Sequence, residues 1–119
     1  MENEAKNNWC FTSWNEIKFN KYNLCEFMIY QKEKCKTGRL HYQGYIEFKK
    51  PYKLNQVKSL FKETAICFSD ARESKERNIL YCSKLDTYAG LRVTYSETNL
   101  ITQEEIVEDW DDFNNMFDI

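Results

Sequence analysis

Apolar and polar residues alternate in short blocks up to about position 95, a pattern typical of β-strands. The alternation predicts five strands, over residues 9–14, 24–31, 40–48, 65–68 and 91–95. The charged run between the second and third strands contains Gly38, whose permissive backbone suits a tight reversal. We therefore expect these two strands to form a hairpin.

Two further segments follow a helical spacing. After Pro51, apolar residues recur at i, i+3, i+6 and i+7 and predict an amphipathic helix, with its other face rich in lysine: Leu54, Val57, Leu60, Phe61. Ser74 can cap a second helix that runs to about Leu85. The order of elements predicts an α+β fold, an antiparallel five-stranded sheet with helices packed on one face.

Charge divides the chain into two parts. All 17 Lys and Arg residues but only 11 of the 19 Asp and Glu residues precede position 97. We expect residues 1–96 to form one basic domain and residues 97–119 an acidic tail or linker. An apolar stripe in that tail indicates either a short helix or disorder: Ile101, Ile106, Val107, Trp110. No run approaches the roughly 18 apolar residues of a membrane span, and no secretory signal is predicted.

The five cysteines indicate free thiols. Their number is odd and no two form a CxxC pair, so neither a disulfide framework nor a zinc finger is predicted. Several stand among apolar residues, as in WCF and ICF, where a thiol packs as a small hydrophobe. We expect them to be reduced and mostly buried.

The chain's single histidine has neighbours suited to a metal. His41 and Gln43 are two positions apart on a predicted strand, so their side chains share a face. Glu33 lies across the predicted hairpin, whereas Glu47 is about 20 Å along the strand from His41. An imidazole, an amide oxygen and a carboxylate suit Mn²⁺ or Mg²⁺ better than zinc. A lone histidine is more often a satisfied polar group, so spacing alone leaves both interpretations open.

A phenol and an ammonium are adjacent on the second predicted helix. Tyr81 and Lys84 are at i and i+3, and a nearby cation favours a tyrosine nucleophile. Such a pair also arises by chance in many helices, so the spacing alone does not establish catalysis.

Three motifs in order resemble one known family. CFTSW at 10–14, HYQGYIEF at 41–48 and YCSK at 81–84 together resemble the HUH-type endonuclease domain of rolling-circle replication initiators (Rep) of small circular single-stranded DNA viruses, closest to nanovirus and circovirus Rep. The hairpin segment 30–44 also resembles the nanovirus sequence. The resemblance spans about residues 9–90 and implies a ferredoxin-like or RRM-like fold.

The resemblance implies a role for each motif residue. It implies a metal site for Mn²⁺ or Mg²⁺, a nucleophile that nicks and rejoins single-stranded origin DNA through a 5′-phosphotyrosine, a lysine companion and an assisting acid; these are in turn Glu33, His41 and Gln43, then Tyr81, Lys84 and Asp86. The chain departs from the family where Trp14, Asn15 and Glu16 replace an Asn-Asn-Pro ending and where Leu85 replaces a common acidic residue.

The resemblance also implies a DNA partner, the hairpin loop of a replication origin, and the host nucleus as location. Such binding needs phosphate contacts and stacking surfaces. The candidates are Trp9, Thr12, Trp14, Tyr45, Lys49 and Lys50, with the helical lysines Lys53, Lys58 and Lys62. Rep proteins also carry a C-terminal helicase domain, but no GxxxxGK[ST] loop occurs here, so we expect the nuclease part alone or a short form.

Two other functions explain part of the sequence. A non-catalytic nucleic-acid-binding module of the RRM type would use exposed aromatic residues on central strands and leave Tyr81 without a role. A small interaction domain would use the acidic tail, and explains only the uneven charge.

Overall fold

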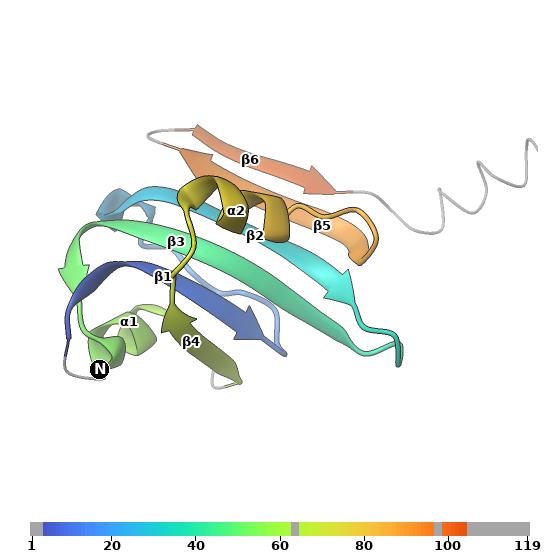
Figure 1. Cartoon of the computed structure of the whole chain (residues 1–119), viewed down its shortest axis with the longest axis horizontal. Coiled ribbons are helices and arrows are strands. Elements are labelled where there is room, and N and C mark those ends of the chain that lie inside the picture. The colour runs from blue at the N-terminus through green and yellow to red at the C-terminus, as the bar shows by residue number, and fades with distance from the viewer. Residues whose placement is uncertain (1–3, 63–64, 97–98, 105–119) are drawn as a thin grey trace, which may run out of the picture.

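The computed structural model describes residues 4–62, 65–96 and 99–104, and within them the chain forms one six-stranded antiparallel sheet (Figure 1). The strands lie in the order β4-β1-β3-β2-β5-β6. In chain order they are β1 (Lys6–Ser13), β2 (Cys25–Lys34), β3 (Leu40–Tyr52), β4 (Ile66–Asp70), β5 (Tyr88–Ser96) and β6 (Asn99–Glu104).

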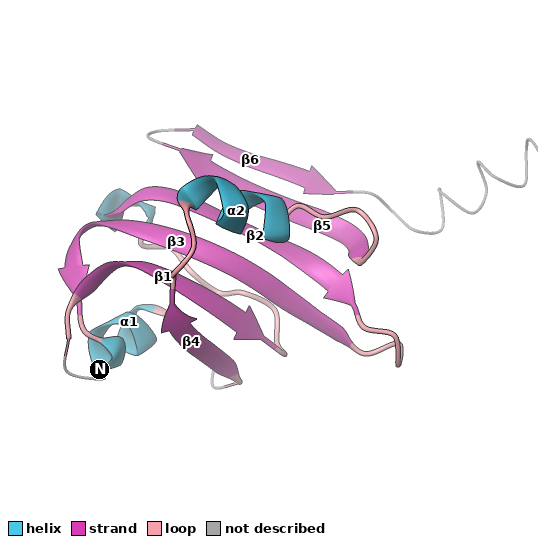
Figure 2. Cartoon of the chain, viewed as in Figure 1, coloured by secondary structure: helices cyan, strands magenta, loops and turns pink. Residues whose placement is uncertain are grey.

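Three short helical segments connect or cover the strands (Figure 2). They are the 3₁₀ turn η1 (Tyr22–Leu24) and the helices α1 (Leu54–Leu60) and α2 (Lys75–Tyr81). The α+β class and the antiparallel sheet confirm the prediction, as does the hairpin between β2 and β3. No helix among the described residues is long and apolar enough to cross a membrane.

The main core lies on one face of the sheet. Alternate residues of the central strands point to this face, among them Phe11, Met28 and Ile46, all almost fully buried. Helix α1 packs here through Val57 and Phe61. The aromatic rings of this cluster lie 4.6–6.5 Å apart between centroids, the spacing of favourable ring pairs.

The opposite face carries a smaller apolar cluster beneath α2. Phe27, Ile29 and Tyr45 lie on this face and pack against Cys82, with Ile79 of the helix at the edge. The two helices thus cover opposite faces, whereas we predicted both on one face. The reason is the nearly continuous apolar run in β2, which places large side chains on both faces, so that each needs a cover.

Helix α2 begins where predicted but ends earlier. The hydroxyl of Ser74 accepts a hydrogen bond from the Arg77 amide, which confirms the predicted cap. The helix ends at Tyr81 rather than near Leu85. The Ser83 hydroxyl donates back to the Ile79 carbonyl at 2.6 Å, so the chain turns away from the helix axis here.

The acidic segment contributes a strand that was not predicted. Residues 99–104 form β6, which pairs with β5 along its whole length. They form neither a helix nor a disordered tail. Residues 105–119, which hold most of the predicted apolar stripe, lie outside the described residues.

Gly44 is required by close packing in the middle of the sheet. It pairs with Phe11 across β1 and β3, and a Cβ at position 44 would overlap the Phe11 ring. We expect Gly44→Ala to lower the free energy of unfolding by about 1–3 kcal/mol, because a filled core relaxes poorly around added atoms. Urea unfolding monitored by circular dichroism measures this, and an unchanged midpoint would contradict the packing.

All five cysteines are free thiols, as predicted, and they differ in exposure. Burial raises the pKa of the Cys25 thiol to about 12 and also raises the pKa of Cys82, whereas Cys67 is exposed. Because the thiolate is the reactive form and a raised pKa keeps the thiol protonated, we expect Cys25 and Cys82 to stay unmodified at pH 8 until the protein unfolds.

Titration with a chromogenic disulfide reagent measures these reactivities. We expect Cys67→Ser to remove the most rapid phase, because Cys67 is the exposed thiol. Rapid modification of Cys25 or Cys82 in the folded protein would show that the packing differs from that described.

Candidate active site

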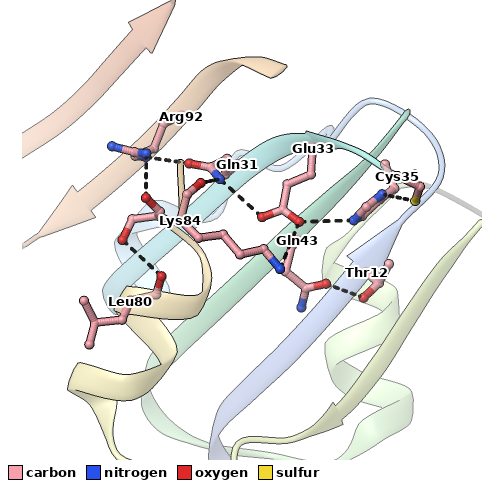
Figure 3. Close-up of polar contacts among 10 residues, drawn as sticks. Thr12, Gln31, Glu33, Cys35, Gln43, Leu80, Lys84 and Arg92 are labelled. Atoms are coloured by element: carbon pink, nitrogen blue, oxygen red, sulfur yellow. Dashed lines mark hydrogen bonds and ion pairs between the residues drawn. The ribbon is translucent and has the colours of Figure 1, made fainter. Parts of the chain in front are cut away.

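A row of polar side chains crosses the α2 face of the sheet on four adjacent strands. The registers pair Thr12 with Gln43, Gln43 with Gln31, and Gln31 with Arg92. The next position along pairs Glu33 with His41. Figure 3 shows these side chains on one face, beside the turn that follows α2.

Glu33 is the centre of this polar group. Its side chain belongs to β2, and the residue is only 1% exposed. One carboxylate oxygen, Oε1, lies 3.3 Å from His41 Nε2 and 3.7 Å from Lys84 Nζ. The other, Oε2, accepts a hydrogen bond of 3.2 Å from Gln31. A buried carboxylate needs such partners, because desolvation of an unpaired charge is costly.

An irregularity in β5 lies beside Glu33. The register of β2 with β5 shifts between Gln31 and Glu33, and two extra residues of β5 are accommodated there. Gly90 in this bulge has a φ of 98°, a conformation that glycine adopts without strain. The bulge alters the spacing of the side chains that β5 presents next to the site.

His41 is held from three sides. Its Nε2 faces Glu33, and its Nδ1 lies 3.2 Å from the Cys35 thiol. The Trp14 ring lies 5.3 Å from the imidazole, and the Arg39 guanidinium stands 3.9 Å above that same indole. Sequence reasoning missed Cys35 and Arg39, although both flank His41 in the hairpin.

Gln43 completes a set of oxygen and nitrogen donors. It follows His41 on the same face, and its Oε1 accepts a 2.9 Å hydrogen bond from the Thr12 hydroxyl. An amide oxygen has two lone pairs, so one is still available for a ligand. Within the described ranges no three His, Cys, Asp or Glu side chains gather as a metal-binding group, so any such site depends on this amide oxygen.

Tyr81 and Lys84 come to the same place from the end of α2. Tyr81 is the last helical residue and is 53% exposed. The Lys84 ammonium lies 4.1 Å from the centroid of the Tyr81 ring and also contacts Glu33. A single cation therefore stands between the exposed phenol and the buried carboxylate. Asp86 is exposed in the following loop.

Two of the aromatic candidates for DNA contact are buried. Trp9 lies in the main core and Tyr45 lies beneath α2, so the prediction that they offer stacking surfaces is wrong. Strand parity places them on the two faces, but both faces are covered at these positions. Trp14, by contrast, is 39% exposed beside His41.

The two strand lysines lie away from the candidate site. Lys49 and Lys50 are exposed, but Lys49 is eight residues from His41 along β3, a separation of about 26 Å in an extended strand. Contacts from them would reach DNA well outside the group around Glu33.

Gln31 and Arg92 are further residues that sequence reasoning missed. Gln31 shares the face of Glu33 by the period of two, and it is a polar residue in an otherwise apolar strand, which is the signal that could have identified it. Arg92 belongs to the last predicted strand, and only the sheet order brings it beside Gln31.

Comparison with known proteins identifies relatives of this chain. Residues 6–85 match a family model for viral replication proteins. The chain is 34% identical over 80 residues to the master replication protein of Milk vetch dwarf virus (isolate N), which covers 66% of this chain and 27% of that protein. It is 38% identical over 87 residues to the replication-associated protein of Pigeon circovirus, covering 67% and 27%.

A third relative is the master replication protein of Subterranean clover stunt virus (strain F), 40% identical over 53 residues, or 44% of this chain and 18% of that protein. The chain thus spans little more than a quarter of the length of the relatives it matches. The segment matched by the family model contains Glu33, His41, Gln43, Tyr81 and Lys84.

Proposed function

This chain belongs to the viral replication protein family, and we propose that it initiates rolling-circle replication by nicking and rejoining single-stranded origin DNA through Tyr81. One observation carries the proposal. The Lys84 ammonium lies between the exposed Tyr81 ring, at 4.1 Å, and the buried Glu33 carboxylate, at 3.7 Å. A nucleophile, a cation and a set of oxygen and nitrogen donors thus meet at one place.

The reaction is a transesterification at a phosphodiester. The Tyr81 oxygen attacks the phosphorus and loses its proton, and the bond from phosphorus to the 3′-oxygen breaks. The leaving 3′-oxygen takes up a proton and becomes a free hydroxyl, and the 5′-phosphate remains esterified to Tyr81. Attack by a 3′-hydroxyl on this linkage reverses the step and rejoins the strand.

Lys84 acts on charge that develops during the reaction. Its ammonium is close to the Tyr81 ring and stabilises negative charge as the phenol loses its proton. Because it also contacts Glu33, its side chain is held near the place where the phosphate would lie. An ordered cation needs little rearrangement at the moment of reaction.

The donor set fits a divalent cation such as Mn²⁺ or Mg²⁺. Glu33 Oε1 and His41 Nε2 are already 3.3 Å apart, and Gln43 lies on the same face. Carboxylate, imidazole and amide donors suit such a cation, which when bound would polarise a phosphate oxygen. Cys35 faces His41 Nδ1 and leaves Nε2 directed at Glu33, so these two residues would hold the imidazole in place.

The natural partner in this proposal is the hairpin loop of a replication origin, in the nucleus of the host cell. The names of the viral relatives, all replication proteins, support this assignment. In a full-length protein a C-terminal helicase domain would follow, as the greater length of the relatives allows. The binding-module alternative is less well supported, because only Trp14 of the three aromatic candidates is exposed.

Metal binding tests the donor set. We expect Glu33→Gln to weaken Mn²⁺ binding by at least tenfold, because the variant loses the charge that attracts the cation. Isothermal titration calorimetry measures the affinity. Glu47→Gln is the matched control, since Glu47 lies on the same strand face as His41 but pairs with Tyr45 and Lys75. Equal affinities in the two variants would contradict the assignment.

Covalent capture tests the nucleophile. We expect Tyr81→Phe to fold and bind DNA but to form no adduct, because the attacking oxygen is absent. The purified protein is incubated with Mn²⁺ and a pool of single-stranded origin-like oligonucleotides with hairpin loops, and resolved on a denaturing gel.

Two controls accompany the adduct assay. Tyr52→Phe removes a phenol oxygen at the far end of β3 and is expected to leave adduct formation intact, while EDTA is expected to abolish it. An adduct at the wild-type level in Tyr81→Phe would overturn the assignment. DNA binding without any adduct in the wild-type protein would favour the binding-module alternative.

A further inference from the structure

A fully buried glutamine lies beneath the turn that carries the proposed catalytic residues. Gln31 is 0% exposed, and its amide group uses both ends. Its Nε2 donates to the Lys84 carbonyl at 2.7 Å and to Glu33 Oε2 at 3.2 Å. Its Oε1 accepts from Arg92 Nε at 2.8 Å. The chemistry proposed above uses neither Gln31 nor Arg92.

Arg92 holds the same turn from the neighbouring strand. While its Nε donates to Gln31, its terminal NH2 group donates to the Ser83 carbonyl at 2.9 Å. Two consecutive backbone carbonyls, of Ser83 and Lys84, are thus fastened to the sheet by side chains from β2 and β5 (Figure 3). Buried carbonyls need such partners, because an unpaired one is costly.

The position of Tyr81 depends on this attachment. Helix α2 has seven residues, too few to be stable without tertiary contacts. Tyr81 is its last residue and is half exposed, so little packing holds the phenol itself. The attached carbonyls are two and three positions further on, and they are the nearest described backbone points fastened to the sheet by hydrogen bonds from side chains.

The same glutamine also contacts the metal-ligand candidate Glu33. One amide nitrogen therefore joins the turn of the proposed nucleophile to the carboxylate at the centre of the site. Both are set by a side chain whose own orientation is fixed by Arg92. A displacement of either end would alter the distance between the phenol and the donor set.

We propose that Gln31 and Arg92 are a pair of positioning residues that dock the turn after α2 onto Glu33 and so set the distance from Tyr81 to the donor set. The catalytic part of this inference rests on the function proposed above. The docking part concerns only the chain's own contacts, and can be measured without any reaction. Neither residue touches the reacting atoms.

The test compares substitutions in the full chain. Gln31→Met keeps the side-chain length and removes all three hydrogen bonds of the amide. Arg92→Met removes the guanidinium at a partly exposed position and provides a second variant if Gln31→Met folds poorly. Arg92→Lys keeps the charge but cannot reproduce two donors in a fixed fork. Gln103→Met is the matched control, because Gln103 is exposed on β6 directly opposite Arg92.

The first measurement is hydrogen exchange followed by mass spectrometry. We expect peptides over residues 79–88 to exchange about tenfold faster in Gln31→Met and Arg92→Met than in the control, while peptides from β1 and β3 stay unchanged. Protection in that segment comes from amides such as Cys82 and Ser83, which bond within the turn. Unchanged exchange would overturn the docking, as would equal acceleration across the sheet, which indicates general destabilisation.

The second measurement is the rate constant of adduct formation at saturating DNA and Mn²⁺. We expect a loss of roughly tenfold to a hundredfold in both methionine variants, since small displacements of reacting groups have effects of this size. Arg92→Lys should retain an intermediate rate. Locally faster exchange with an unchanged rate would overturn the positioning role. If the wild-type protein forms no adduct, the proposed function fails, and the exchange data still decide whether the pair docks the turn.

Discussion

The burial of the Glu33 carboxylate is the constraint on which the site depends. A charged group at 1% exposure is tolerated only when other groups compensate for the loss of water. Here the compensation comes from His41 across the hairpin, Lys84 after α2 and Gln31 on the same strand. One carboxylate therefore draws together β2, β3 and the turn that carries Tyr81. Removal of any of these partners would leave the remaining charge less well paired.

The sheet can hold such a group because its two faces do different work. One face buries most of the large apolar side chains, beneath α1 and the segment before β2, and supplies most of the hydrophobic stabilisation. The other face is apolar only beneath α2, at Phe27, Ile29 and Tyr45, and is polar from Gln31 onward. The change occurs within β2, so a single strand supports the core and presents the site.

The placement of the aromatic residues follows from the same division. Trp9 and Tyr45 have the composition of a stacking surface, but each points into a covered part of the sheet. Trp14 stands at the end of β1, beyond the apolar cluster, and there it meets His41 and Arg39. Exposure, rather than residue type, separates the aromatic side chain available to a ligand from those that hold the fold together.

Local regularities of the sequence were sufficient to predict most strands, the hairpin and the shared face of His41 and Gln43, because strand parity and turn chemistry act over a few residues. The hairpin register also placed Glu33 opposite His41. The end of α2, the cover on both faces, the β6 strand and the roles of Gln31 and Arg92 were not predictable in this way. Each depends on contacts between segments distant in the chain, such as the 61 positions between Gln31 and Arg92. Periodicity shows which face a side chain occupies, but only the assembled sheet determines what it meets there.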